Sequence, residues 1–453
     1  MLERVFHLSE NKTTVKREIA AGITTFMTMA YILAVNPDLL GKAGMDPTAV
    51  LLATALASFL ATVCMGFMAN LPFALSAGMG LNAYMAYTVC GSMGYPWQVA
   101  LLAVFVEGLI FIVMSLTNVR EAIFNAIPLA LKRGVSVGIG LFIAFIGLQN
   151  AGLVVDGPTL VGLVDFRTNF NTAGICAILC LIGVFITAVL HIKNVKGSIL
   201  IGIVGTWVLG MLCQLSGLYV PNPELGYFSL FPQMAMTDFS ALGKTFGQCF
   251  TVDFSVIHPL NFIVVIFSFL FVDVFDTLGT LIGVSTKANM LDEEGKLPKI
   301  KPALLADAIG TTAGAVMGTS TITTFVESAS GVAAGGRTGL TAITTGVLFL
   351  LSTLLAPLFV AIPAFATAPA LIIVGFLMFS GVTDLKFDQE HLTDTIPAYL
   401  AIIGMPLFYS ISEGIALGII SYVVLNVAMG KAKKVTPLMY VLMVLFILKY
   451  IFL

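Results

Sequence analysis

The sequence has few charged residues for its length. Its 453 residues include only 22 Lys and Arg and 24 Asp and Glu, so charged side chains make up 10% of the chain, against about 25% in an ordinary soluble domain. Hydrophobic residues make up 58%. A single soluble core cannot bury that much apolar surface, so the composition excludes a cytosolic enzyme, a nucleic-acid-binding protein and a disordered chain.

Other features that are missing narrow the class further. The sequence lacks the ten-residue alternating segments of a transmembrane barrel, and its long apolar runs between short polar loops are typical of a polytopic α-helical membrane protein. Residues 1–18 are polar and the first apolar run begins at Ile19, so we expect no signal peptide. Cys176 and Cys180 share one apolar run without a nearby acid or His, which favours a core position over a metal site.

Apolar runs and breakers predict fourteen spans. Their approximate ranges are 19–40, 49–69, 77–91, 96–118, 121–150, 172–191, 196–215, 259–287, 301–318, 326–336, 338–361, 366–382, 393–409 and 411–429. The spans 77–91 and 326–336 are too short to cross a hydrocarbon core of about 30 Å as helices. A last apolar stretch, 435–453, could be interfacial, an extra span or packed along the bundle.

The basic residues support this topology. With the N-terminus in the cytoplasm, the predicted outer loops contain only Lys42, Arg167 and Lys244. Eighteen of the 22 basic residues lie on the cytoplasmic side, as the positive-inside rule requires. They include Arg120 after the fourth span and Lys296 before the ninth.

The chain also repeats itself weakly. The stretch 197–209 resembles 414–425, and the two short spans are each the third in a set of seven. Because seven is odd, two such halves have opposite topology, which is the arrangement of an inverted-repeat transporter. The connection 216–258, rich in Pro and aromatic residues, would join the halves outside the membrane.

Both short spans have interrupted helical patterns. In the first, Pro72, Gly78 and Gly80 argue against a continuous helix, and in the second, 319–325 is rich in hydroxyl and β-branched residues and favours an extended segment. Two short strands, one from each half, could pair and lead into half-helices that point their N-terminal N–H groups at the middle of the protein. The alternative is a pair of Gly-kinked helices.

Five acidic residues fall inside the predicted spans: Glu107, Asp273, Asp276, Asp307 and Glu327. Each costs about 2.5–3.5 kcal/mol at the bilayer centre and therefore needs a reason. The i,i+3 spacing of Asp273 and Asp276 places them on one helix face, where two carboxylates do not ionise together easily; this suits a proton-coupled carrier. Glu327 lies in the first turn of the proposed half-helix, so the three acids could share one site.

Each acid has a structural alternative, in which neighbouring hydroxyl or backbone groups hydrogen-bond it. That alternative is favoured for Glu107, a functional role is favoured for Asp273, Asp276 and Glu327, and Asp307 suits either. Asn82 lies on the other half-helix and offers a donor and an acceptor. The structural alternative for Asn82 is a polar helix cap.

At these residues the chain resembles a known family. The stretches are 22–37, Ala77-Gly-Met-Gly-Leu-Asn-Ala-Tyr, Val272-Asp-Val-Phe-Asp-Thr-Leu-Gly-Thr and Thr323-Thr-Phe-Val-Glu-Ser-Ala-Ser-Gly-Val. They resemble nucleobase–cation symporters of the xanthine/uracil permease superfamily, in the adenine/guanine/hypoxanthine branch. The resemblance extends from about residue 1 to the end of the chain.

The resemblance implies an all-α fold of 7+7 inverted repeats with a core and a gate domain. The core would comprise 19–118 and 259–361, and the gate 119–215 and 362–430, with 1–18 as a cytoplasmic N-terminus and 431–453 as a tail. It also implies elevator-type movement of the core, proton symport without another cofactor, a homodimer formed through the gate, and a place in the cell membrane. Neither an enzyme activity nor a nucleic-acid partner is implied.

The resemblance also assigns residues. The substrate-binding acids would be Asp276 and Glu327, with Asp273 and Asn82 at further polar positions of the purine branch. The segment Phe325, Val326 and Ser328 would present backbone N–H groups to a base carbonyl, and Asp276, Glu327 and Asp307 would couple the proton. Thr280 stands where uracil and xanthine members often carry His, which argues against those bases and against a His relay.

Hydrogen-bond chemistry favours guanine and hypoxanthine as substrates. An ionised carboxylate only accepts hydrogen bonds. Guanine offers N1–H beside an amine, hypoxanthine offers N1–H, and both have a C6 carbonyl. Adenine presents an acceptor at N1 and would need a protonated acid or Asn82.

Three other functions are compatible with the architecture in general. An anion exchanger of the same fold should replace the acids of the eighth and tenth spans with neutral or basic residues, which this chain does not do. An intramembrane hydrolase would need a catalytic signature. The sequence has no Asp-Thr-Gly or His-Glu-x-x-His motif, and no Gly-x-Ser-x-Gly motif at a plausible nucleophile elbow. A channel would differ from a carrier by lacking saturation and a steep dependence on the proton gradient.

Overall fold

A computed structural model describes residues 2–117, 119, 127–157, 160–232, 235–287, 290 and 297–452. The basic residues Arg120 and Lys296 and the first part of the predicted span 121–150 lie outside the described residues. Helices account for most of the rest, and short strands occur at two places.

The helices of the first half follow the predicted spans closely. They are α1 (Leu2–Phe6), α2 (Val15–Met29), α3 (Ile32–Gly41), α4 (Pro47–Cys64), α5 (Met79–Ala83), α6 (Trp97–Leu116), α8 (Leu129–Asn150), α9 (Ile175–Ile192) and α10 (Ser198–Leu215). Stretches of π-helix extend α4 over Met65–Ala69 and α5 over Tyr84–Ser92. The predicted span 19–40 is divided, because α2 ends at Met29 and α3 begins at Ile32.

The second half follows after several short 3₁₀ turns. It contains α11 (Pro259–Lys287), α12 (Ile300–Met317), α13 (Ser328–Ala333), α14 (Gly339–Ser352), α15 (Ala356–Val360), α16 (Ala364–Phe379), α17 (Leu392–Leu407), α18 (Ile411–Ala428) and α19 (Pro437–Phe452). Within the described ranges, nine helical segments are long and apolar enough to cross a membrane, and shorter apolar helices accompany them. A multi-pass helical membrane fold is therefore confirmed, while the number fourteen stays a prediction.

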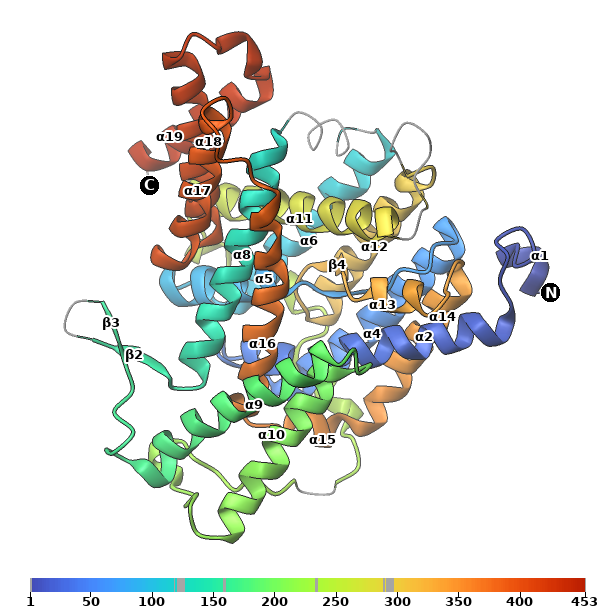
Figure 1. Ribbon diagram of the computed structural model, residues 1–453, viewed down its shortest axis with the longest axis vertical. Coiled ribbons are helices and arrows are strands. Elements are labelled where there is room, and N and C mark those ends of the chain that lie inside the picture. The colour runs from blue at the N-terminus through green and yellow to red at the C-terminus, as the bar shows by residue number, and fades with distance from the viewer. Residues whose placement is uncertain are drawn as a thin grey trace.

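The helices pack in two groups. Helices α2–α6 and α11–α15 pack mainly on one another and surround a pair of short strands; we call them the strand-bearing group. Helices α8–α10 and α16–α18 form the second group. In Figure 1, β4 and α13 lie near the middle of the molecule, while the green α9 and α10 lie at its lower end and the red α17 and α18 at its upper left.

The C-terminal helix α19 packs along the bundle, which is one of the three placements considered for the tail. It contacts α18, and the ring of Phe446 makes a T-shaped contact with Phe267 of α11 at 5.8 Å between centroids. Tyr450 donates a hydrogen bond to Glu413 of α18. The tail therefore contacts a helix of each group.

The strands join the two halves of the chain. Strand β1 (Leu75–Ala77) pairs antiparallel with β4 (Ile322–Thr324), with Ser76 opposite Thr323. The ladder extends by one bond at each end, from Phe325 N–H to the Ala74 carbonyl and from Gly78 N–H to the Thr321 carbonyl, both 3.0 Å. Each strand then runs into a short helix, α5 or α13.

Threonine hydroxyl groups satisfy the outer edge of each strand. Thr62 of α4 donates to the Leu75 carbonyl at 3.1 Å and accepts from Leu75 N–H at 2.9 Å. Thr311 of α12 does the same for Ile322, at 3.0 and 3.2 Å. All of these groups are buried, where no water replaces a missing partner. In both halves the hydroxyl comes from the helix that precedes the strand.

Two features were missed by the sequence analysis. A second strand pair, β2 (Val154–Asp156) with β3 (Val161–Leu163), lies in a predicted outer loop; its six residues are too few to give a strand pattern. Glu18, placed in a cytoplasmic terminus, is completely buried and caps α14 by accepting hydrogen bonds from Arg337 N–H and from Thr338 and Thr341.

The threonines at the strand edges should contribute to stability in both halves. Thr62→Val and Thr311→Val keep the side-chain shape but leave a buried N–H and carbonyl without a partner, at roughly 1–3 kcal/mol for each group. We expect both variants to melt at clearly lower temperature in detergent than the parent chain. Thr312→Val is the matched control, because among the described residues that hydroxyl bonds only to the Ala308 carbonyl in its own helix. Melting of all three at one temperature would contradict the interpretation.

Candidate binding site

The strand pair brings two helix N-termini to the middle of the bundle. Gly78 is the N-cap of α5 and Glu327 the N-cap of α13. The Ser328 N–H is already used in a turn, where it donates to the Phe325 carbonyl at 3.1 Å. Among the described residues, the N–H groups of Val326 and Glu327 donate to no backbone carbonyl. The backbone donors expected near Val326 and Ser328 are therefore those of Val326 and Glu327.

Glu327 lies at the start of α13. Its Oε1 accepts a hydrogen bond from Tyr31 Oη at 2.7 Å, and its side chain remains partly exposed. The preceding residue, Val326, is 44% exposed although the segment before it is buried. The surface of the chain is therefore accessible directly beside Glu327.

Asp276 lies against the strand pair from α11. Its Oδ2 accepts from Thr323 Oγ1 at 3.3 Å. A Cβ at Gly78 would come within 3.3 Å of that oxygen and 3.0 Å of the Thr323 hydroxyl, so glycine is the residue that leaves this space open. Asp276 is partly exposed.

Asp273 takes a different position from its neighbour on α11. It is fully buried and accepts from Thr277 Oγ1 at 2.8 Å, and the same hydroxyl lies 3.1 Å from Asp307 Oδ1 on α12. Residues three apart on a helix differ by about 60° in direction, which is enough to turn Asp273 toward α12 and Asp276 toward β4. Of the three acids expected to share one site, Asp276 and Glu327 are thus partly exposed, while Asp273 belongs to a buried cluster with Asp307.

The predicted residues Asn82, Ser328 and Phe325 are all buried. Asn82 is completely buried, with Nδ2 3.5 Å from the Ala77 carbonyl and Oδ1 without a partner among the described residues. Ser328 Oγ accepts from Ala74 N–H at 3.0 Å and so fixes the start of β1. Phe325 is buried, with its ring 6.5 Å from that of Tyr31.

Glu107 has the structural surroundings that the sequence analysis favoured. It is fully buried, and its Oε2 accepts from Thr321 Oγ1 at 2.8 Å, just before β4. Two other contacts were not predicted. Tyr31 and Thr323 lie in stretches singled out above, but a Tyr in an apolar run and a Thr in a strand give no sign of the carboxylate that each one contacts.

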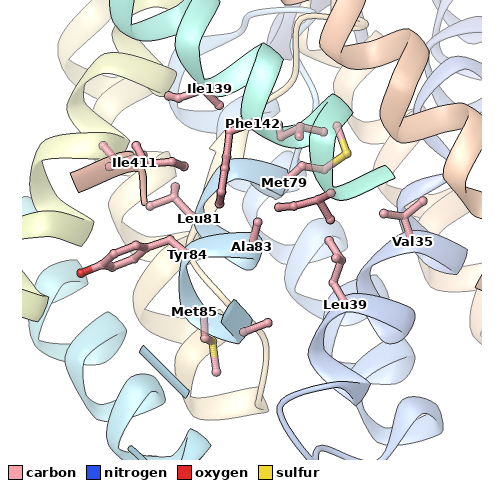
Figure 2. Packing of buried hydrophobic residues seen from close by; sticks show 14 of the residues in the cluster. Val35, Leu39, Met79, Leu81, Ala83, Tyr84, Met85, Ile139, Phe142 and Ile411 are labelled. Atoms are coloured by element: carbon pink, nitrogen blue, oxygen red, sulfur yellow. The ribbon is translucent and has the colours of Figure 1, made fainter. Parts of the chain in front are cut away.

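Helix α5 lies on the boundary between the two groups. Figure 2 shows Met79 and Leu81 of α5 facing Ile139 and Phe142 of α8, with Ile411 of α18 nearby. A Cβ at Gly80 would be 3.0 Å from Ile139, so glycine permits this close approach.

Polar contacts cross the same boundary near the ends of α3 and α8. Asn150 accepts hydrogen bonds from Lys42 and, at 3.1 Å, from Tyr87. Thr367 of α16 donates to Asp38 of α3 at 3.4 Å. The boundary is thus apolar along α5 and polar at this end.

Comparison with known proteins identifies the relatives of this chain. The model of the xanthine/uracil permeases, described as a permease family, matches residues 16–417. An adenine permease of Escherichia coli is 42% identical over 455 residues, covering 100% of this chain and 96% of its own length. A guanine/hypoxanthine permease of Bacillus subtilis is 44% identical over 451 residues, covering 98% and 99%.

The fold is also found in a solved structure. The transmembrane domain of a cyanobacterial bicarbonate transporter superposes with a TM-score of 0.62 at 15% identity, covering 89% of this chain and 97% of that domain. At this identity the likeness concerns the fold alone.

The exposure of Val326 can be tested by thiol labelling. In a variant whose six native cysteines are replaced, Val326→Cys should react with a water-soluble maleimide roughly tenfold faster or more than Ala77→Cys, because thiol reactivity requires access. Ala77 is completely buried in β1 and serves as the control. Equal labelling rates would show that the space beside Glu327 is closed.

Proposed function

The chain belongs to the xanthine/uracil permease family, and from this premise we propose that it is a secondary active transporter that imports purine nucleobases together with protons. One observation carries the proposal. Two partly exposed carboxylates, Asp276 and Glu327, flank a strand pair at the N-terminus of a half-helix, in a chain that otherwise has few charges. Acids at this depth are costly unless they bind something.

A purine base fits the chemistry of these groups. The Glu327 carboxylate would accept the N1–H of the base, and the N–H groups of Val326 and Glu327 would donate to its C6 carbonyl. Asp276 would accept from the opposite edge of the ring, which carries a further N–H. Gly78 leaves room for the base beside Thr323. Asn82 would contribute from α5 if the base or the helix shifts.

Guanine and hypoxanthine suit this arrangement better than adenine. Both present N1–H to an acceptor and a carbonyl to the backbone donors, whereas adenine reverses both groups. The two relatives described above are named for adenine and for guanine/hypoxanthine. Because adenine would need a protonated acid, protonation of Asp276 or Glu327 would determine which base binds.

We further propose that the chain has fourteen spans in two inverted repeats. The matching roles of Thr62 and Thr311 support a repeat, because each satisfies the strand that follows its own helix. The strand-bearing group would be the core (19–118 and 259–361) and the second group the gate (119–215 and 362–430), with 216–258 between the halves. The apolar boundary along α5 suits elevator-type movement of the core.

The setting of the protein follows from the same proposal. The chain would lie in the cell membrane with its N-terminus in the cytoplasm and would form a homodimer through the gate. The transported proton would be its only coupling ion. Asp276 and Glu327 would take up and release that proton. Asp307 would also take part, and its contact with Thr277 connects it to Asp273.

Anion exchange is the second candidate, because the solved structure of similar fold is a bicarbonate transporter. Two acids beside the half-helix would repel an anion. Exchange of an anion should therefore be absent if the acids form the site.

Uptake into proteoliposomes tests the proposed function. Labelled guanine, hypoxanthine and adenine are offered with and without an acidic exterior, each in competition with the others, and bicarbonate is offered separately. We expect saturable uptake of guanine and hypoxanthine that an acidic exterior accelerates. Uptake of bicarbonate alone, or of no base, would contradict the proposal; base uptake that ignores the pH gradient would contradict proton coupling.

Removing the charge of Glu327 should strongly reduce transport. Glu327→Gln removes the charge and one of the two acceptor oxygens that the base would use, and puts an N–H in its place, so we expect uptake to fall by roughly 100-fold or more. Glu107→Gln is the matched control, since its amide oxygen can still accept from Thr321, and it should retain uptake. Wild-type uptake in a normally expressed Glu327→Gln variant would refute the site.

A further inference from the structure

One contact at the site points to a means of distinguishing between bases. Tyr31 Oη donates a hydrogen bond to Glu327 Oε1 at 2.7 Å, across 296 residues of sequence. We propose that Tyr31 is a positioning residue that determines specificity by holding the Glu327 carboxylate in the plane that guanine requires. This inference rests on the proposed function.

Tyr31 acts from behind Glu327. Its side chain is completely buried, whereas Glu327 and Val326 are open to the site. It lies between α2 and α3, and its backbone carbonyl accepts from the N–H groups of Ala34 and Val35, each at 3.0 Å. A buried residue anchored in this way meets the carboxylate but not a base in the open space, so its influence passes through Glu327.

The orientation of a carboxylate needs such a partner. The last torsion of a Glu side chain is broad and roughly two-fold, so an unsupported carboxylate turns over a wide range. A hydroxyl bonded to Oε1 fixes that torsion. Each carboxylate oxygen accepts more than one hydrogen bond, so Oε1 and Oε2 both remain able to bind a ligand.

The two proposed substrates depend on this orientation to different degrees. Guanine presents two neighbouring donors, N1–H and the 2-amino group, which must meet both carboxylate oxygens at the same time in a bidentate pair. Hypoxanthine has only N1–H on that edge, and a single donor can follow a carboxylate that turns. Tyr31 should therefore strengthen the binding of guanine more than that of hypoxanthine.

The test compares the two bases in one set of variants. KM values for labelled guanine and hypoxanthine are measured in proteoliposomes for the wild type, Tyr31→Phe and Tyr422→Phe. Tyr422 is a buried tyrosine on α18 and is the matched control. We expect Tyr31→Phe to raise KM for guanine roughly tenfold, because guanine would lose one of its two hydrogen bonds to the charged carboxylate. KM for hypoxanthine, which keeps its single hydrogen bond, should rise by about twofold at most. Tyr422→Phe should change neither.

A second substitution separates the hydroxyl from the ring. Tyr31→4-aminophenylalanine keeps a donor at the same place and should restore the wild-type preference. Tyr31→4-methylphenylalanine fills the same space without a donor and should behave like Tyr31→Phe. This pair also decides the matter if Tyr31→Phe yields no folded carrier.

The outcomes distinguish the two proposals. Equal KM shifts for both bases, or no shift for guanine, would overturn the role of Tyr31 while leaving purine transport intact. If the wild type transports neither base, the proposed function fails and this inference fails with it.

Discussion

The arrangement depends on one constraint, which is that backbone polar groups in a water-free interior must all find partners. Between helices near the middle of the bundle, β1 and β4 pair with each other. Thr62 and Thr311 hydrogen-bond the backbone groups on the outer edges of the two strands. Each threonine satisfies both an N–H and a carbonyl. The helix ends at Gly78 and Glu327 are thereby fixed in place, and the proposed site is built on them.

The two strands and the helices that follow them make different contacts. The β4 half supplies Thr323, which meets Asp276, and Glu327, which meets Tyr31. The β1 half supplies the open space at Gly78 and the apolar helix α5, which faces α8 and α18 (Figure 2). One half therefore carries the groups that contact the two acids, while the other packs an apolar helix against the neighbouring group of helices.

Local features of the sequence predicted much of this. Pro72, Gly78 and Gly80 in one span, and the hydroxyl-rich run before Val326 in the other, mark the interruptions because their effect on the backbone is local. Isolated acids stand out for a similar reason, since few residues in an apolar span can be charged without a purpose. Asp276 and Glu327 were found by that argument, and the structure places both beside the strands.

Contacts between residues far apart in the sequence could not be predicted from such local features. Tyr31 and Glu327 belong to different halves, and nothing in an apolar run indicates which tyrosine faces an acid. Asp273 and Asp276 have a spacing that suggests a common partner, yet Asp273 lies toward α12 and Asp276 toward strand β4. Glu18 stands in a polar stretch that gives no sign of burial, although α14 is capped by its carboxylate.

A structure determined with guanine bound would test the central claim most directly. The account predicts the base beside Val326, with N1–H and the amino group against the Glu327 carboxylate, the C6 carbonyl at the N–H groups of Val326 and Glu327, and Asp276 at the opposite edge. Guanine bound away from both acids would contradict it. The cavity of about 280 Å³ lined by Asp38 and Lys42 is one such place.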